Sequence, residues 1–436
     1  METPGPFSFG RLTGPLPVAL ILRALVRVLL PSQATQTGGF ELGRGLSVET
    51  VKPGELTPEE IGLWMAFIQA DAGYASPYFH PAFTRVAGEV TPGAAVALIH
   101  QGGDIVGFFP HQRRGSRVQP IGAPLNDYHG VIARPGFAPV LQDLPALLGA
   151  ASIAVNGWTG PGEGNKLVGR QTLQADLSQG WAAYDAERRD TWRKYFRDKD
   201  RARRSLERDH GALTVAFDGT DPASLTRLLT LKREQFNRSG RHDIFACGWT
   251  GDLLRALPQA TEPGFGVRLA VLRAGGRPIA YEYGLYAGDQ YHFWLPAYEA
   301  GTSRYSPGIL LSLETMRLGA AEGFRLFDYG FEGEAYKKYA CNREQTVLDG
   351  VVHAPGFANA IEAALAKVGA GPALTVGAAL GQAPLSVSVR RRWAAIDACE
   401  TTVTGRVRGV AAAVSTVVNR ASAPRAGIGL LTLLNV

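Results

Sequence analysis

VRLAVLRAGGRPIAYEYGLY, from Val267 to Tyr286, consists of two strand-like runs on either side of Gly275-Gly276. Apolar runs joined by a two-glycine turn are typical of a β-hairpin. The pattern also occurs earlier, where AAVALIHQ from Ala94 is followed by Gly102-Gly103 and by IVGFFPHQ. The two glycine pairs lie 173 residues apart, which is a domain length. We therefore expect a structural duplication with two α/β halves, each containing one hairpin.

The sequence after the second hairpin predicts a regular order of elements. A strand over Gln290–Ala297 precedes a helix that opens at Ser306-Pro307-Gly308 and ends near Glu322, where Gly323 closes it. The remaining elements are a strand over Arg325–Tyr329, a short helix over Gly333–Ala340, a strand over Gln345–Val352, and an earlier helix over Asp221–Gly240. Together they predict an α/β fold with a mixed sheet.

Four segments are expected along the chain. Residues 1–50 read as a leader with an amphipathic helix and a linker, 51–185 as the first half, 186–353 as the second half with the main motifs, and 354–436 as an Ala-rich basic helical appendage. The leader run from Pro17 to Pro31 is too short to span a bilayer and carries Arg23 and Arg27 on one helical face. This helix packs on the protein body or contacts a membrane surface, and no segment reads as transmembrane.

The composition narrows the class of protein. The 436 residues carry a net charge of +6, but from Val352 onward eight basic residues face three acidic ones, so nearly all the excess lies in the tail. A near-neutral body argues against nucleic-acid binding. The tail is a solvated basic helix or contacts anionic lipid. The three cysteines are far apart in the sequence and are expected to be free thiols in a reducing, cytoplasmic compartment, with peripheral contact to the inner membrane.

The stretch TSRYSPGILLSLETM, from Thr302 to Met316, is the candidate donor site. Pro307 suits a first helical turn, Gly308 allows close backbone approach, and Ser306 is expected to cap the helix with its hydroxyl. The free amides and the positive end of the helix dipole attract an anion such as a diphosphate. Tyr305 and Ile309 complete the segment. The alternative is a well-capped helix without a ligand.

Two acidic positions and a short helix are the catalytic candidates. Asp328, in FDYGFEGEAYKKYA, ends a buried strand, and Tyr336 and Lys337 follow it as a proton donor and a stabiliser of negative charge. The alternative is a salt bridge between Asp328 and a lysine. Glu282 lies mid-strand on the face opposite Tyr281 and Tyr283, which makes it a general-base candidate or a solvent-facing glutamate.

The substrate-binding candidates come from three places. His292 and Trp294 share a face of the strand after Glu282. In the first half, LNDYHG brings Asp127, Tyr128 and His129 into a loop, with a simple turn as the alternative. Arg204 belongs to a cluster with Arg201 and Arg203 in the charged helix Asp190–Asp209, which meets an anionic substrate or only solvent. No Walker loop, H-E-x-x-H or paired Cys-x-x-Cys motif is present, and no metal is expected.

The motifs YSPGILL and FDYGFEGEAYKK resemble the signature of the CelD/BcsL-type acetyltransferases, a GNAT branch linked to cellulose and exopolysaccharide synthesis and similar in architecture to the FemAB-like ligases. RARRSLERD and NDYHG are also similar, so the likeness covers roughly residues 50–353. It implies tandem GNAT domains, an acyl-CoA donor, most simply acetyl-CoA, and a sugar or polysaccharide precursor as acceptor. The GNAT pattern Q/R-x-x-G-x-G/A is absent, and Arg304–Leu310 stands in its place with one glycine.

Two other functions remain open from the sequence. A FemAB-like ligase would use aminoacyl-tRNA and needs a basic groove near Arg201–Arg204. A non-catalytic component of a polysaccharide-export assembly would be anchored through its termini and would bind no acyl-CoA.

Overall fold

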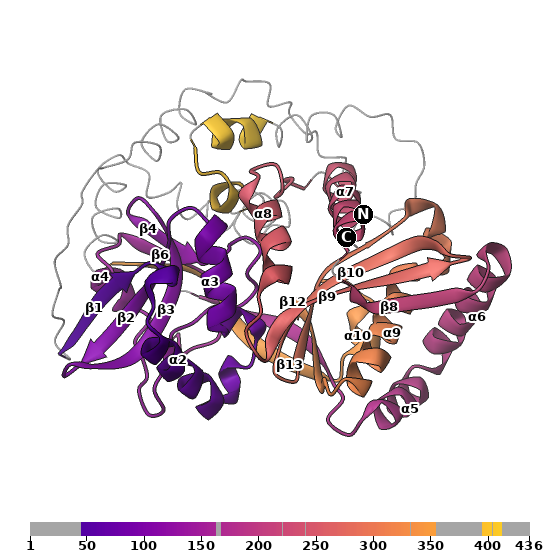
Figure 1. Cartoon of the computed structure of the whole chain (residues 1–436), viewed down its shortest axis with the longest axis horizontal. Coiled ribbons are helices and arrows are strands. Elements are labelled where there is room, and N and C mark those ends of the chain that lie inside the picture. Colours follow the sequence, from indigo (N-terminus) through magenta and orange to yellow (C-terminus); the bar gives the residue numbers. More distant parts are fainter. Residues whose placement is uncertain are drawn as a thin grey trace, which may run out of the picture. The chain divides into compact units, whose positions relative to one another are not determined.

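The computed structural model describes residues 45–162, 167–219, 221–239, 241–331, 333–354, 395–402 and 404–411. Its strands belong to one mixed 13-stranded sheet in the order β1-β2-β3-β4-β6-β13-β7-β12-β11-β10-β9-β8, with β5 paired to β3. Figure 1 shows strands of this sheet from indigo (β1) to orange (β12 and β13), so segments from both halves of the chain contribute to it. The predicted leader helix and most of the predicted helical appendage over 354–436 lie outside the described residues.

The first half contains both strands and helices. Its elements are β1 (Leu46–Val51), η1 (Pro53–Glu55), α2 (Pro58–Ala70), η2 (Ala72–Tyr74), η3 (Pro77–Phe79), α3 (Pro81–Val90), β2 (Ala94–Gln101), β3 (Asp104–Arg114), β4 (Arg117–Pro120), β5 (Ile132–Ala133), α4 (Leu144–Leu147), β6 (Ser152–Trp158) and β7 (Val168–Asp176). The sequence Thr57-Pro58-Glu59-Glu60 predicts a capped helix start, and the structure confirms it: the Thr57 hydroxyl accepts from the Glu60 amide and the Glu60 carboxylate accepts from the Thr57 amide.

The second half follows two connecting helices, α5 (Trp181–Thr191) and α6 (Arg193–His210). Its elements are β8 (Leu213–Gly219), α7 (Pro222–Ser239), α8 (Trp249–Ala256), η4 (Leu257–Gln259), β9 (Phe265–Ala274), β10 (Arg277–Ala287), β11 (Gln290–Tyr298), η5 (Ala300–Tyr305), α9 (Pro307–Ala321), β12 (Leu326–Phe331), α10 (Lys337–Ala340) and β13 (Arg343–His353). The continuous helix expected over Asp190–Asp209 is wrong, because Trp192 leaves helical geometry (φ −123°, ψ 44°) and separates α5 from α6.

The strand order shows the duplication directly. Read from either edge, the sheet has the same pattern: β1-β2-β3-β4-β6 on one side and β8-β9-β10-β11-β12 on the other. Corresponding pairs also agree in direction, since β2–β3 and β9–β10 are antiparallel while β4–β6 and β11–β12 are parallel. The two predicted hairpins occupy equivalent places, with Gln101 paired to Asp104 and Ala274 paired to Arg277 across their glycine turns.

The last strand of each half is exchanged with the other half. β7, which ends the first half, pairs with β12 of the second, and β13, which ends the second half, pairs with β6 of the first. β7 and β13 then pair with each other at the centre of the sheet. Each half therefore completes its sheet with a strand of the other, and the boundary proposed at residues 185 and 186 falls within α5.

The apolar cores follow this arrangement. One cluster contains Phe83 and Phe108 of the first half together with Leu253, Tyr283 and other residues of the second. A second cluster lies between the opposite face of the second half's sheet and α9, with Phe327 and Met316 at its centre. Among the described residues, the helices are too short or too polar to cross a bilayer.

The exchange predicts that the halves fold together. A fragment of residues 181–354 lacks β7, so that β12 and β13 lose the neighbour that they share. We expect this fragment to show no cooperative thermal transition by circular dichroism, whereas residues 45–354 melt in a single transition. A cooperative melt of the 181–354 fragment by itself would contradict the structural role given to β7.

Candidate active site

Strands β11 and β12 meet only briefly at the middle of the second half. Their parallel pairing covers three residues of each strand, Gln290–His292 and Leu326–Asp328, although β11 continues to Tyr298 and β12 to Phe331. At the far edge of β12 the register with β7 shifts between Asp328 and Phe331, where Gly330 adopts a φ of +66°. His292 and Asp328 are the last paired residues, and beyond them the two strands separate. Both are predicted site residues.

Asp328 is completely buried and has partners from both halves of the chain. Its carboxylate accepts hydrogen bonds from the Tyr128 hydroxyl at 2.8 and 2.9 Å, the Gln174 amide at 3.1 Å and the Gly330 backbone amide at 2.6 Å. Burial acts to raise the pKa of Asp328, but His292 and these donors outweigh it and hold the pKa below its ordinary value. The predicted alternative, a salt bridge from Asp328 to a lysine, is therefore wrong.

His292 lies between two carboxylates. Its Nε2 is 3.1 Å from Asp127 Oδ2, and its Nδ1 is 3.7 Å from Asp328 Oδ1. Burial acts to lower the pKa of His292, but the hydrogen bond with Asp127 and the charges of Asp328 and Asp127 raise it to about 9. The imidazole is therefore protonated at neutral pH, and Asp127, whose side chain is 26% exposed, connects this buried group with the surface.

The other predicted binding residues lie outside this cluster. His129 Nε2 accepts from the Asn156 amide at 3.1 Å, and burial lowers the pKa of this histidine to about 3. Trp294 packs on Tyr78 and Tyr283 in the apolar core. Arg204 is exposed on α6. The structure thus brings Asp127 and Tyr128 to His292 and Asp328, and gives His129 and Trp294 neighbours typical of a core.

Glu282 is a buried carboxyl on β10. Its side chain is only 2% exposed, and its Oε1 has no hydrogen-bond partner within the described part of the chain. Burial raises the pKa of Glu282 to about 8, although the charges of His292 and Lys232 oppose the shift. The alternative of a solvent-facing glutamate is wrong. The expected alternation is confirmed, because Tyr281 and Tyr283 join one apolar cluster and Ala280 the other.

Tyr336 and Lys337 stand at the start of the short helix α10. Burial, followed by the charges of Glu334 and Glu282, raises the pKa of Tyr336 far above its ordinary value, so its hydroxyl stays protonated. Lys337 is buried, and its ammonium group donates to the Phe331 carbonyl at 2.6 Å and lies 2.8 Å from the Glu334 carboxylate. Lys337 therefore fastens α10 to the end of β12.

The start of α9 has a cation beside it that the sequence did not reveal. Ser306 adopts a left-handed φ of 53°, and its hydroxyl accepts a hydrogen bond from Lys199 of α6 at 2.8 Å. The predicted side-chain cap by Ser306 is therefore wrong, because the hydroxyl is turned to Lys199 while the Ser306 carbonyl accepts from the Ile309 and Leu310 amides.

The first turn of α9 is only partly covered. Pro307 is buried, whereas Gly308 and Ile309 are half-buried. A Cβ atom built on Gly308 would meet one neighbouring atom within 4 Å, in the Tyr298 ring at 3.6 Å. The hydroxyl of Tyr305 is engaged elsewhere, since it donates to Asp209 at 2.7 Å. The turn therefore retains room beside Gly308 for a ligand.

Aromatic rings connect this turn with α10. The Lys199 ammonium lies 5.0 Å from the centre of the Tyr195 ring, and Tyr195 stacks on Tyr339 at 3.8 Å. Tyr339 belongs to α10, the helix that Lys337 holds in place. One side of α6 thus contacts both the start of α9, through Lys199, and α10, through Tyr195. In the sequence, Trp192, Tyr195 and Phe196 fall on one side of the charged segment, and this spacing is the signal for a packed face.

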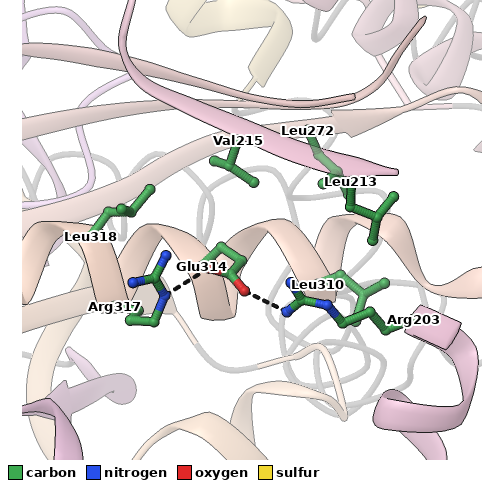
Figure 2. Close-up of a pocket in the computed structure, with 8 residues that line it drawn as sticks. All are labelled: Arg203, Leu213, Val215, Leu272, Leu310, Glu314, Arg317 and Leu318. Atoms are coloured by element: carbon green, nitrogen blue, oxygen red, sulfur yellow. Dashed lines mark hydrogen bonds and ion pairs between the residues drawn. The ribbon is translucent and has the colours of Figure 1, made fainter. Parts of the chain in front are cut away.

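A pocket of about 150 Å³ lies apart from these residues, between α6, β8, β9 and α9. Five aliphatic side chains line it, and Figure 2 shows Glu314 at its edge between Arg203 and Arg317. Glu314 is 2.5 Å from Arg203 and 2.8 Å from Arg317. Because these charges satisfy one another and no predicted site residue lines the pocket, we do not assign it to the reaction.

The part of the chain that holds these groups matches a known domain family. Residues 193–338 match the family described as acetyltransferase (GNAT) domain. The second half contains a GNAT domain. The match includes Lys199, Glu282, the start of α9, and Asp328 through Lys338, and it ends before β13. GNAT domains typically use acyl-CoA, and the described residues include no group of three His, Cys, Asp or Glu side chains suited to a metal ion.

Solved structures give a looser likeness, and no curated protein matches the chain. A tandem GNAT protein from clavulanic acid biosynthesis has a TM-score of 0.42 and 10% identity, covering 71% of this chain and 98% of that one. FemX has a TM-score of 0.40 and 13% identity, with coverage of 70% and 96%. The C-terminal domain of a protein named putative lysylphosphatidylglycerol synthetase, from Agrobacterium fabrum, has a TM-score of 0.39 and 12% identity, covering 70% of this chain and 96% of that one. These TM-scores are too low to support an assignment.

The buried carboxylate predicts a graded response to tyrosine substitutions. Tyr128→Phe removes a donor to a buried charge and should lower the free energy of unfolding by about 2 kcal/mol. Tyr283→Phe removes an equally buried hydroxyl that donates to the neutral Leu254 carbonyl at 2.8 Å, and should cost about 1 kcal/mol. Urea denaturation measures both values. Equal costs for the two variants would contradict the role given to Asp328.

Proposed function

We propose that the chain transfers an acyl group, most simply acetyl, from acyl-CoA to an amine or hydroxyl of a sugar or polysaccharide precursor. One observation carries the proposal: within the GNAT match, Glu282 holds an unpartnered buried carboxyl oxygen close enough to His292 for their charges to interact, and His292 lies where β11 and β12 separate. A buried carboxyl with a pKa near 8 is suited to accept a proton at neutral or mildly basic pH.

The donor's phosphates are proposed to rest on the first turn of α9. The positive end of a 15-residue helix favours an anion there, and the Lys199 ammonium beside Ser306 adds a full charge. Tyr305, Ser306, Pro307, Gly308 and Ile309 form the segment that would hold the diphosphate. In this proposal the Lys199 ammonium supplies part of the phosphate binding that a glycine-rich Q/R-x-x-G-x-G/A loop would otherwise provide through its backbone amides.

The proposed reaction is a direct transfer. The acceptor nitrogen or oxygen attacks the thioester carbonyl while Glu282, directly or through water, takes the proton that it loses. The carbon–sulfur bond then breaks, and the leaving thiolate takes the Tyr336 proton as the proton gained by Glu282 is returned to Tyr336. The raised pKa of Tyr336 means that its phenolate does not persist, so the net change is one proton moved from the acceptor to the thiol. Backbone amides stabilise the oxyanion, because the Lys337 ammonium is already occupied by Phe331 and Glu334.

The acceptor is proposed to approach Asp127. The Asp127 carboxylate is partly exposed and lies against His292. On its other side His292 faces Asp328, which accepts a hydrogen bond from Tyr128. In this proposal Asp328 is a positioning residue, because its oxygens are fully engaged inside the protein. The sugar or polysaccharide nature of the acceptor rests on the resemblance to CelD/BcsL-type enzymes. The proposed cytoplasmic location rests on the free cysteines, and the proposed contact with the inner membrane rests on the terminal segments of the sequence.

The charge pattern of α6 favours acyl-CoA over aminoacyl-tRNA as the donor. Arg201 pairs with Asp198, and Arg203 pairs with both Glu207 and Glu314. These carboxylates cancel much of the positive charge that a tRNA-binding groove needs.

Replacing the proposed base should remove both activity and its pH dependence. We expect kcat/KM of the native protein to rise with pH toward a plateau above about 8, where Glu282 is ionised. Glu282→Gln should lower kcat/KM by roughly 10²–10⁴ and abolish this rise, measured as acetyl-CoA consumed with amino-sugar acceptors. Glu322→Gln, which changes a carboxylate paired with Arg268, serves as the control.

The same substitution has a separate effect on stability. The folded pKa of Glu282 lies above its ordinary value of 4.5, so the native protein loses stability as pH rises from about 4.5 to about 8. Glu282→Gln should not lose stability over this pH range. The unfolding transition from which its stability is measured also shows that the variant is folded. Full turnover by a folded Glu282→Gln protein would rule out Glu282 as the base.

A further inference from the structure

Two cysteines that are 152 residues apart in the sequence meet in the fold. Cys247 lies in the loop before α8, and Cys399 lies in the segment of residues 395–402. The Cys247 sulfur is 3.2 Å from the Ile244 carbonyl oxygen, and the Cys399 sulfur is 3.7 Å from the same atom. Both sulfurs therefore lie against one carbonyl oxygen. All three cysteines are free thiols, as expected, but Cys247 and Cys399 lie side by side although they are far apart in the sequence.

The surroundings make the two thiols chemically different. Cys247 is partly exposed, and hydrogen bonds from Cys399 and Thr250 lower the pKa of its thiol to about 7. Cys399 is completely buried, and the neighbouring Cys247 thiol, together with burial, raises the pKa of the Cys399 thiol. The Cys247 thiol is thus partly exposed and partly ionised at neutral pH, and the Cys399 thiol beside it stays protonated.

The segment that carries Cys399 joins the two halves of the protein. Asp397 is 2.9 Å from Arg117 of β4, and the Ala398 carbonyl accepts from Gln119 of the same strand at 3.3 Å. On the other side, the Cys399 carbonyl accepts from the Trp249 indole of α8 at 3.0 Å. A covalent bond at Cys399 would therefore fasten a segment that already bridges the first half and α8.

We propose that Cys247 and Cys399 are an oxidation site that closes to a disulfide when a hydroperoxide is present. The Cys247 thiolate attacks the peroxide, an S–O bond forms as the O–O bond breaks, and an alcohol or water leaves. The Cys399 sulfur then attacks the Cys247 sulfur and displaces hydroxide, which takes the Cys399 proton and leaves as water. Two thiols and one hydroperoxide give one disulfide, one alcohol and one water. The bond locks residues 395–402 to the loop before α8.

The test uses the full chain treated with stoichiometric hydrogen peroxide, alkylated after unfolding, and mapped by mass spectrometry without reduction. The expected product is a peptide pair linked through Cys247 and Cys399, lighter by two hydrogens, with Cys341 alkylated. Cys341 is the internal reference, since it is buried and its thiol pKa is raised to about 12. The oxidised protein should also melt roughly 5 °C higher than the reduced one.

Single variants separate the two steps. Cys399→Ser should leave Cys247 as a sulfenic acid that reacts with dimedone, and Cys247→Ser should leave Cys399 as a free thiol. Cys341→Ala should keep the linked pair. The proposal is overturned if, in the native protein, Cys247 proceeds to sulfinic acid while Cys399 remains alkylatable, or if neither thiol reacts. Because the native chain gives the deciding result, a variant that fails to fold does not affect the outcome.

Discussion

The buried carboxylate of Asp328 is the constraint around which the two halves are assembled. Burying a carboxylate without hydrogen-bond or charge partners is strongly unfavourable, and the Asp328 side chain is completely buried. Its donors come from three places: Tyr128 in a loop of the first half, Gln174 on the exchanged strand β7, and Gly330 beside it on β12. Two of the three belong to the first half. The second half can therefore hold this charge only when the first half is in place.

That constraint also shapes the electrostatics of the candidate site. Asp328 keeps His292 protonated, and His292 in turn holds Asp127 at the edge of the cluster. Glu282, which lacks a comparable set of donors, is driven toward its neutral form by burial. Two carboxyl groups in the same region thus differ in charge because one has hydrogen-bond donors and the other does not. Differences of this kind are how a protein assigns separate roles to chemically similar side chains.

The sequence predicted the features that depend on neighbouring residues. Glycine pairs at 102–103 and 275–276, the capped start of α2 and the Pro307 opening of α9 are local signals, and the structure contains all of them. It did not predict the exchange of β7 and β13, because strands of either half read alike. Lys199 and Gln174 were also missed, since each acts across more than 100 residues, on Ser306 and Asp328 respectively. The Cys247–Cys399 pair was hidden for the same reason.

The central claim is that the second half alone binds acyl-CoA, at the start of α9. The equivalent helix in the first half, α4, has four residues and offers no comparable site. Calorimetric titration with acetyl-CoA and with free CoA tests this directly on the native chain, on Gly308→Glu and on Arg204→Glu. The Arg204 substitution is the control, since it changes the charge twice as much as Gly308→Glu does, at an exposed position of α6. We predict one equivalent of either ligand bound by the native and Arg204→Glu proteins, with binding lost in Gly308→Glu. Two equivalents, or unchanged binding by Gly308→Glu, would contradict the account.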